Sequence, residues 1–508
     1  MTDKSLQRTM FETSRVLEYF TERELSYQTG HSRDAWPQVI LKELLDNALD
    51  ACEDASVAPE IKVELRDEGQ FFSMAVEDNG PGIQPEVITR ILNFQTRTSD
   101  KEAYVSPTRG AQGNALKTVF AIPYVLSAST PKEGTCEMES QCIKHTIKVR
   151  LDMIKQEPRI EHEQVEIVKN QGCRISVWLD NTSIPDSFNK GQFLQMMENY
   201  HLFNPHLSLR FQFTKETLQV GRSSVEADKY YNMIPTGLSE KEREALISGY
   251  KDVDSKIKGN SFVGEDSNGT AFVEQDYKAT NPGWHKWKPN DFTSPLWYSN
   301  EDLKKLILSH VALAQDGDRD LTLREFVAQF RGLTSTAKQK VVISRLPGIK
   351  RLSDFVSNGD ADSPLISALL ENMKSQTRPV PPQNLGIIGE EHFRKCFEGR
   401  EVKYTRKMGG KDNIPFVVEV AYIPDEHLEG VTFHFGLNFA PASSDPLQSC
   451  RLVHKAKKEN FEGSGIKGLA ARYRVDYWDK VHVVCHVAYP RFRFKDRGKT
   501  ILEMGNEW

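Results

Sequence analysis

The stretch VILKELLDNALDACEDA, residues 39–55, decides the fold of the first part of this chain. Its apolar residues recur at steps of three and four positions, which predicts an amphipathic helix. The apolar face consists of Leu41, Leu44, Leu45, Ala48 and Cys52. Glu43, Asn47 and Asp50 share the other face at the same spacing, so we expect their side chains to lie together.

Glu43 and Asn47 are one helical turn apart, so the ends of their side chains converge on one small volume. A carboxylate in such a place can take a proton from water as a general base. An amide oxygen is a neutral, hard ligand of the kind that Mg²⁺ accepts beside phosphate oxygens and waters. For these two residues alone, a solvated polar face is the simpler explanation.

A strand that ends in a glycine-bearing turn follows the helix, in FFSMAVEDNGPGI at residues 71–83. Asp78 closes this strand on the side of its alternating apolar residues, so its carboxylate is expected at the edge of the core. There it can accept a hydrogen bond from the exocyclic amine of adenine. Gly80 and Gly82 allow the backbone to approach a ligand without interference from a Cβ atom. The ordinary alternative is a hairpin turn, for which Asp-Asn-Gly is common.

A second glycine-bearing segment, Arg109-Gly110-Ala111-Gln112-Gly113-Asn114, leads into a predicted helix at 115–120. Glycines before a helix N-terminus leave amide groups free to bind phosphate, and the helix dipole adds to this effect. A plain helix start is the competing explanation. The segment GCRISV, residues 172–177, then opens a strand whose first small residue could line a base pocket.

The order of the elements predicts the fold class. Alternating apolar residues indicate strands at 61–65, 71–78, 145–151 and 174–180, and helices are expected at 39–55, 85–94 and 115–120. Helices and strands in this order are expected to form an α+β sandwich, with the helices on one face of a mostly antiparallel sheet.

The rest of the sequence divides into further parts. The predicted parts are an N-terminal arm at 1–23, the α+β domain at 24–213, an irregular connection at 214–298, a helical domain at 299–374 and an α/β domain at 385–508. The stretch SQTRPVPPQN, residues 375–384, contains three prolines and is expected to be a linker. Beyond it, PFVVEVAYI, VTFHFGLNFA and KVHVVCHVAY predict strands.

The composition excludes several classes of protein. Of the 508 residues, 38% are hydrophobic and 27% are charged, which is not typical of a disordered chain or a small disulfide scaffold. No apolar run approaches the roughly 18–20 residues of a membrane-spanning helix, and the start lacks the apolar stretch of a secretory signal. We therefore expect a soluble, cytoplasmic protein without a membrane partner. The seven cysteines are scattered without CxxC spacing, which predicts reduced thiols and no zinc site.

The net charge of −5 argues against a globally basic nucleic-acid binder, although it is compatible with a local basic channel. Two clusters could contact a DNA backbone. One consists of Arg491, Arg493, Lys495, Arg497 and Lys499, and the other of Lys338, Lys340, Arg345, Lys350 and Arg351. The alternation Arg-Phe-Arg-Phe in the first cluster is equally typical of a strand with one wet and one buried face.

Taken together, the helix, the Asp78 turn, the glycine-bearing segment and the Gly172 strand resemble the nucleotide-binding (Bergerat) domain of the GHKL ATPase superfamily. That resemblance implies that Glu43 is the general base, Asn47 holds Mg²⁺ and Asp78 recognises adenine. It also implies ATP contacts at the remaining motif positions. These are Gly80, Gly82, Arg109, Gly110, Gln112, Gly113 and Asn114, with 110–114 as the phosphate lid.

Within that superfamily, KELLDNALDACEDA and the arginine-glycine-x-glutamine-glycine lid are similar to the B subunit of DNA topoisomerase VI. The stretch LREFVAQFRGLTSTAKQKVV resembles its helix-two-turn-helix insert, and VHVVCHVAYPRFRFKDRGKT resembles its transducer domain. The resemblance implies a catalytic role for Lys499, at the γ-phosphate of ATP. Two positions and the C-terminal segment depart from the pattern. Asn114 replaces an aliphatic residue, Cys173 replaces threonine, and only Thr500–Trp508 follow Lys499 where the family has a long helix.

The resemblance implies an ATP-driven clamp whose two copies close on DNA, with their N-terminal arms crossing between the two copies, and whose separate partner cleaves the DNA. An arm that packs on its own domain is the alternative for residues 1–23. A second functional class is a GHKL clamp of a DNA-defence or remodelling system that acts with a separate nuclease and without strand passage. A sensor kinase and a chaperone fit the sequence poorly.

Overall fold

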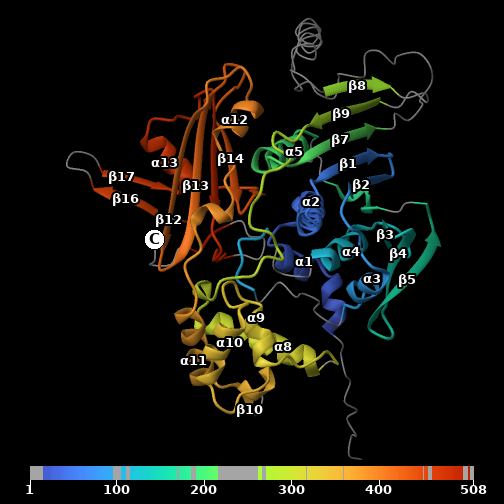
Figure 1. Cartoon of the computed structure of the whole chain (residues 1–508). Coiled ribbons are helices and arrows are strands. Elements are labelled where there is room, and N and C mark those ends of the chain that lie inside the picture. Colours follow the sequence, from blue (N-terminus) through green and yellow to red (C-terminus); the bar gives the residue numbers. More distant parts are fainter. Residues whose placement is uncertain are drawn as a thin grey trace, which may run out of the picture.

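The computed structural model describes residues 15–94, 104–109, 115–168, 171–184, 190–215, 261–265, 271–315, 317–357, 360–449, 451–455, 460–495 and 501–503. Figure 1 shows two sheets beside each other and a block of helices beneath the C-terminal sheet. None of the helices in these residues is long and apolar enough to cross a membrane.

The N-terminal sheet has nine strands in the order β5-β4-β3-β6-β2-β1-β7-β9-β8. The strands are β1 (Glu60–Asp67), β2 (Phe71–Asp78), β3 (Gly134–Ser140), β4 (Ile143–Asp152), β5 (Glu157–Glu166), β6 (Cys173–Asp180), β7 (Ser208–Lys215), β8 (Ser261–Glu265) and β9 (Ala271–Tyr277). Only the β1–β7 pair is parallel among these neighbours. The predicted strands at 61–65, 71–78, 145–151 and 174–180 are confirmed, as is the α+β class.

The segment expected to be an irregular connection at 214–298 differs from that expectation, because it contributes β8 and β9 to the edge of the same sheet. Strand β9 pairs with β7 through backbone hydrogen bonds. Strand β8 forms the edge beyond β9, and neither short strand shows a clear alternation of apolar and polar residues from which it could be predicted.

Helices cover this sheet in Figure 1. They are α1 (Glu22–Thr29), α2 (Trp36–Asp54), α3 (Pro85–Ile91), α4 (Ala115–Leu126) and α5 (Lys190–Phe203), with short 3₁₀ turns η1 (Arg15–Phe20), η2 (Arg33–Ala35) and η3 (Asn181–Ser183). The five predicted apolar residues of α2 are all buried, and α2 shares one core with α4 and the sheet. Helix α2 starts with Pro37 in its first turn, where a missing amide hydrogen costs nothing.

The polar side of α2 is less solvated than its sequence suggests. Asp46, Asp50 and Glu53 are buried as well. The phenol of Tyr200 on α5 donates to Asp46 Oδ1 (2.8 Å), and Lys42 Nζ lies 2.6 Å from Asp46 Oδ2. Helix α2 is thus fixed on its polar side by other elements, while its apolar side packs on the sheet.

The helical block contains α8 (Asn300–Gln315), α9 (Leu323–Ala328), α10 (Thr336–Ser344) and α11 (Ser363–Ser375), with η4 (Pro295–Trp297), η5 (Leu352–Phe355) and the two-residue strands β10 (Val356–Ser357) and β11 (Asp360–Ala361). A capping box at Thr322 and Glu325 starts α9. The helices expected between 299 and 374 are therefore present.

The C-terminal sheet has the order β12-β13-β18-β14-β15. Its elements are β12 (Lys403–Lys411), β13 (Ile414–Pro424), β14 (Thr432–Leu437), β15 (Ala440–Ala442) and β18 (Val481–Ala488), accompanied by η6 (Pro382–Leu385), α12 (Glu390–Cys396), α13 (Gly465–Arg472) and the hairpin β16 (Arg451–Lys455) and β17 (Asn460–Ser464). One buried cluster joins this sheet to the helical block, from Leu303 and Phe326 to Val417 and Val484. The two predicted parts at 299–374 and 385–508 thus share a core.

Candidate functional site

Helix α2 presents the predicted base and the predicted magnesium ligand side by side. Glu43 is half-buried and makes no hydrogen bond or ion pair with the part of the chain that the structure describes. The Nδ2 atom of Asn47 is buried and, within the same described residues, has no hydrogen-bond partner. A buried amide without a partner is costly, and a bound ligand could satisfy it.

Asp78 lies opposite this helix, at the end of β2. Its carboxylate is nearly buried, and Oδ1 accepts a hydrogen bond from the Gly80 amide at 2.8 Å. A cavity of about 40 Å³ separates α2 from the ends of β2 and β6. Its lining comprises Leu44, Asn47, Ala48, Ala51, Val76, Asp78, Gly82, Ile83, Leu116, Cys173 and Ile175. The helix and the strand therefore place Asn47 and Asp78 in one cavity, as the sequence predicts.

Glycines allow close packing of the backbone around the end of β2 at Asp78. Gly82 lines the cavity with a φ of +78°, and a Cβ atom there would meet Ser140 Oγ at 2.6 Å. Gly172 also has a φ of +78°, and a Cβ atom added there would lie only 1.8 Å from the carbonyl oxygen of Asp78. Its amide donates to the carbonyl of Gly80 at 3.0 Å. Gly80 does not line the cavity, and a Cβ atom there would meet Asp78 Oδ1 at 2.9 Å.

A volume of about 40 Å³ holds only a few water molecules. A cavity of this size is too small for a whole nucleotide. Cys173 stands opposite Asp78 in the β2–β6 ladder and lines the cavity, which confirms the expected position of this small residue.

The predicted phosphate contacts are only partly visible. Gly110, Gln112, Gly113 and Asn114 lie outside the described residues, and so does Lys499. The side chain of Arg109 is described, and it does not line the cavity beside Asp78. Its guanidinium is fully buried and pairs with Glu53 and Asp50 of α2. The prediction of a phosphate contact by this side chain therefore lacks structural support.

Sequence reasoning missed the role of Glu53. This carboxylate binds Arg109 with both oxygens, at 2.7 Å each. The available signal was the spacing of Asp46, Asp50 and Glu53, which recur at steps of four and three on one side of α2. Three acids on one helix face indicate a cationic partner, although they do not identify it.

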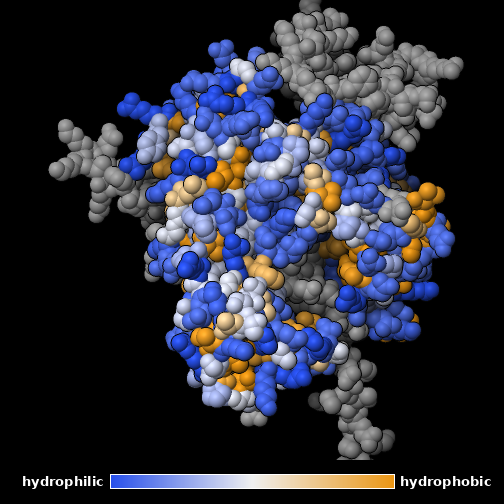
Figure 2. All heavy atoms as spheres, in the orientation of Figure 1, coloured by the Kyte–Doolittle hydropathy of each residue, from blue (hydrophilic) through white to orange (hydrophobic). Residues whose placement is uncertain are grey.

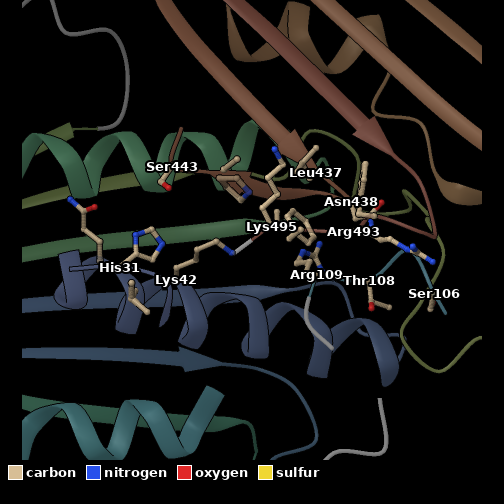
Figure 3. A pocket seen from close by; sticks show the side chains of 18 of the residues that line it. His31, Lys42, Ser106, Thr108, Arg109, Leu437, Asn438, Ser443, Arg493 and Lys495 are labelled. Carbon is tan, nitrogen blue, oxygen red and sulfur yellow. The ribbon is translucent and has the colours of Figure 1, made fainter. Parts of the chain in front are cut away.

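A larger cleft of about 1110 Å³ opens between α2 and the C-terminal sheet. Figure 3 shows Lys42 entering it from α2 and Arg493 and Lys495 entering from the opposite side. The side chains of Arg493 and Lys495 are exposed, without a hydrogen bond or ion pair to any described residue. The part of the first basic cluster that the structure describes therefore faces an open cleft that Lys42 also lines. Figure 2 shows that hydrophilic residues cover most of the visible face of the molecule, with smaller groups of hydrophobic ones.

The segment that carries these cations is not the strand that its Arg-Phe-Arg-Phe pattern suggested. It forms a single bridge, between Phe494 and Leu502, and its described residues are otherwise irregular. In the second cluster, Lys338 Nζ donates to two carbonyl groups of the helical block, and Arg351 donates to the carbonyl of Asp320. These two side chains are used for internal contacts.

Comparison with known proteins agrees with the GHKL resemblance of the motifs around the small cavity. Residues 33–183 match the family model for "Histidine kinase-, DNA gyrase B-, and HSP90-like ATPase". The matched stretch contains α2, β2 and β6, which line the small cavity, so the family match and the cavity fall on the same part of the chain.

Comparison with individual proteins gives a narrower resemblance than the family model does. The chain is similar to the B subunit of type 2 DNA topoisomerase 6 from Natronomonas pharaonis, with 29% identity over 216 residues, 42% of this chain and 26% of that protein. It is also 27% identical over 202 residues to the protein of the same name from Archaeoglobus fulgidus, covering 39% of this chain and 32% of that one. The matched stretches therefore span about a quarter to a third of these relatives' own length.

Among solved structures, the 43K ATPase domain of Thermus thermophilus gyrase B in complex with an aminocoumarin aligns over 96% of this chain and 85% of its own, with 12% identity and a TM-score of 0.35. By sequence, this chain resembles the B subunit of topoisomerase VI, and its residues 33–183 match the GHKL-type family model.

Proposed function

We propose that this chain binds ATP with Mg²⁺ in the cavity between α2, β2 and β6 and hydrolyses it. The observation that carries the proposal is the shared cavity of Asn47 and Asp78, with the carboxylate of Glu43, unpaired among the described residues, one helical turn away. The match of residues 33–183 to the GHKL family model supports the same chemistry.

The residues that line the cavity fit a nucleotide bound together with Mg²⁺. Whichever way the Asn47 amide is oriented, one of its ends is buried at the cavity without a partner among the described residues. An amide oxygen is a ligand that Mg²⁺ accepts, and the bound ion would offset the negative charge of the phosphate oxygens.

Each polar residue then has one task. Asp78 accepts a hydrogen bond from the exocyclic amine of adenine, which fixes the base at the closed end of the cavity. Glu43 accepts a proton from the attacking water, and its carboxylate is available because no described residue forms an ion pair with it. The amides of 110–114 are proposed to bind phosphate, and Lys499 the γ-phosphate.

For the whole protein we propose an ATP-dependent homodimeric clamp in a topoisomerase VI-like assembly, which holds DNA for a separate cleaving subunit. Two findings support this: the name shared by the relatives, and the cationic cleft that faces α2 from the C-terminal sheet. Cations in such a cleft bind phosphate, of a nucleotide or of DNA.

The test compares Glu43→Gln with Asp78→Ala in nucleotide titrations and hydrolysis assays. Removing the base should leave ATP affinity nearly unchanged and lower hydrolysis by about 10²–10⁴-fold. Removing Asp78 should weaken ATP binding by at least about tenfold, because the adenine amine loses its acceptor. Equal loss of binding in both variants would contradict the assignment of these roles. Loss of DNA-stimulated hydrolysis in Arg493→Ala/Lys495→Ala, with basal hydrolysis kept, is expected if the cleft binds DNA.

A further inference from the structure

The guanidinium of Arg109 uses every N–H donor it has. Nη1 donates to Asp50 Oδ1 (3.1 Å) and Glu53 Oε2 (2.7 Å), while Nη2 donates to Glu53 Oε1 (2.7 Å) and to the Asn204 side-chain oxygen. Nε donates to the carbonyl of Phe439 at 3.4 Å. Arginine has five such donors, so none is left for a phosphate.

Glu53 is saturated in the same way. Besides Arg109, it pairs with Lys286 Nζ at 2.7 Å and accepts from His206 Nε2 at 3.0 Å. Burial would raise the pKa of Glu53, but the charges of Arg109 and Lys286 outweigh burial and hold the pKa well below its usual value. The cations Arg109 and Lys286 thus balance the carboxylates of Asp50 and Glu53 in a buried cluster, and removing any member leaves an uncompensated charge.

This buried cluster joins parts of the chain that are far apart in sequence. Asp50 and Glu53 belong to α2, and Arg109 directly precedes the proposed phosphate-binding segment. Phe439 belongs to the tight turn between β14 and β15 of the C-terminal sheet, where Asn438 and Phe439 have φ values of 48° and 68°. The carbonyl of Phe439 also accepts from Asn204 Nδ2 at 3.0 Å.

The side chain of Phe439 anchors that turn. Its ring is fully buried, 5.0 Å from the ring of Trp284 and 4.4 Å from that of His486. The nitrogen of Lys286 lies 5.5 Å from the ring centroid, within reach of a cation–π contact. The turn therefore contacts the buried cluster through its backbone carbonyl and through its ring.

We propose that Arg109 is a positioning residue that couples α2, and with it Glu43 and Asn47, to the β14–β15 turn of the C-terminal sheet. This inference rests on the proposed ATPase function and deepens it. Glu53 lies ten residues, about 15 Å, along the same rigid helix from Glu43. The ion pairs hold Arg109 to α2, so a shift of α2 on nucleotide binding must either carry the turn with it or break the buried hydrogen bond from Arg109 to the Phe439 carbonyl.

Lysine cannot replace arginine here, because its three donors on one nitrogen cannot reach Asp50, Glu53, Asn204 and Phe439 together. We therefore choose Arg109→Lys in the full chain, since it keeps the buried charge. The matched control is Arg210→Lys, which changes an exposed arginine of β7 that pairs with Asp276 on β9. A non-hydrolysable ATP analogue with Mg²⁺ is the probe.

The readouts are analogue affinity, kcat and KM for ATP, and amide hydrogen exchange of residues 437–442 with and without the analogue. In the wild type and in Arg210→Lys, the analogue should slow exchange at the turn. In Arg109→Lys, affinity should stay within about threefold. The exchange response and kcat should each fall about fivefold or more, the lower end of typical coupling between sites.

The outcomes separate this inference from the proposed function. If the wild type fails to bind the analogue, the ATPase proposal fails. If the wild type binds but the turn does not respond, or if Arg109→Lys responds as the wild type does, the coupling role is overturned and ATP binding stands. Loss of binding in folded Arg109→Lys would make Arg109 a ligand residue, which also overturns it. Should Arg109→Lys not fold, Asn204→Ala, which removes contacts to both Arg109 and Phe439, is expected to give the same separation of affinity from response.

Discussion

Replacing Gly172 by alanine is the sharpest test of the cavity's geometry. The backbone there has a φ of +78°, and an added Cβ atom would lie 1.8 Å from the carbonyl oxygen of Asp78. The end of β2 must therefore move by about 1 Å or more, or the strand pairing must break. The control is Gly69→Ala at the β1–β2 turn, with a φ of +76° and nothing within 4 Å of the added atom.

Both variants place an alanine in a left-handed backbone conformation, but only Gly172→Ala also brings its Cβ atom into a steric clash. A left-handed conformation costs an L-residue about 1–2 kcal/mol, which both variants should show. Overpacking adds about 1–3 kcal/mol, for Gly172→Ala only. In a domain of this size 1 kcal/mol corresponds to about 2–4 °C in Tm, so Gly172→Ala should melt about 2–12 °C below Gly69→Ala.

Thermal melting, followed by circular dichroism, measures the loss of stability, and a nucleotide titration measures the loss of ATP affinity. Because Asp78 moves, Gly172→Ala should lose at least about tenfold in ATP affinity, the value of one hydrogen bond to a charged group, while Gly69→Ala binds as the wild type does. Equal melting temperatures would refute the close approach of Gly172 to Asp78. A lower melting temperature with unchanged affinity would refute the position of the base.

Other expected outcomes concern pH, assembly and the C-terminal loop. Burial lowers the pKa of His392 and His434 to about 3, so folding favours their neutral forms. The Tm should therefore fall as the pH drops from about 6.5 towards 3, and His434→Asn should make this pH dependence of Tm weaker. Light scattering should show a mass increase on addition of Mg²⁺ and a non-hydrolysable ATP analogue, and an unchanged mass would remove the clamp proposal. Lys499→Ala should leave ATP binding mostly intact and lower hydrolysis, because a γ-phosphate contact is lost in the transition state.

The sequence was informative where the chemistry is local. Glu43 and Asn47 are one turn apart on a helix whose apolar face is unambiguous, and Asp78 ends an alternating strand, so the period predicts where each lies on its own element. Their assignment to one site came from the resemblance to the GHKL superfamily. Strands β8 and β9 were missed because their residues lack a clear alternation and gain their place by pairing with β7.

Arg109 shows why contacts between distant parts of the chain could not be predicted from the sequence. Its neighbours in sequence are glycines of a phosphate-binding pattern, yet its guanidinium is held by a carbonyl 330 positions away and by an asparagine 95 positions away. Such partners depend on how two sheets dock, and no local period encodes that docking. The local pattern thus led to a phosphate contact for a side chain that the structure uses between α2 and the C-terminal sheet.

Cys173 offers a way to separate the base pocket from the stability of the fold. It opens β6 opposite Asp78 and lines the small cavity. Leucine at this position should fill the cavity, which leaves Tm unchanged or higher while lowering ATP affinity about tenfold or more. Threonine is close to cysteine in size and should keep affinity within about threefold. A site that only supports the fold would show stability and affinity falling together in Cys173→Leu. Affinity that matches the wild type in a stable Cys173→Leu protein would place the adenine elsewhere, because a leucine and a purine edge cannot share about 40 Å³.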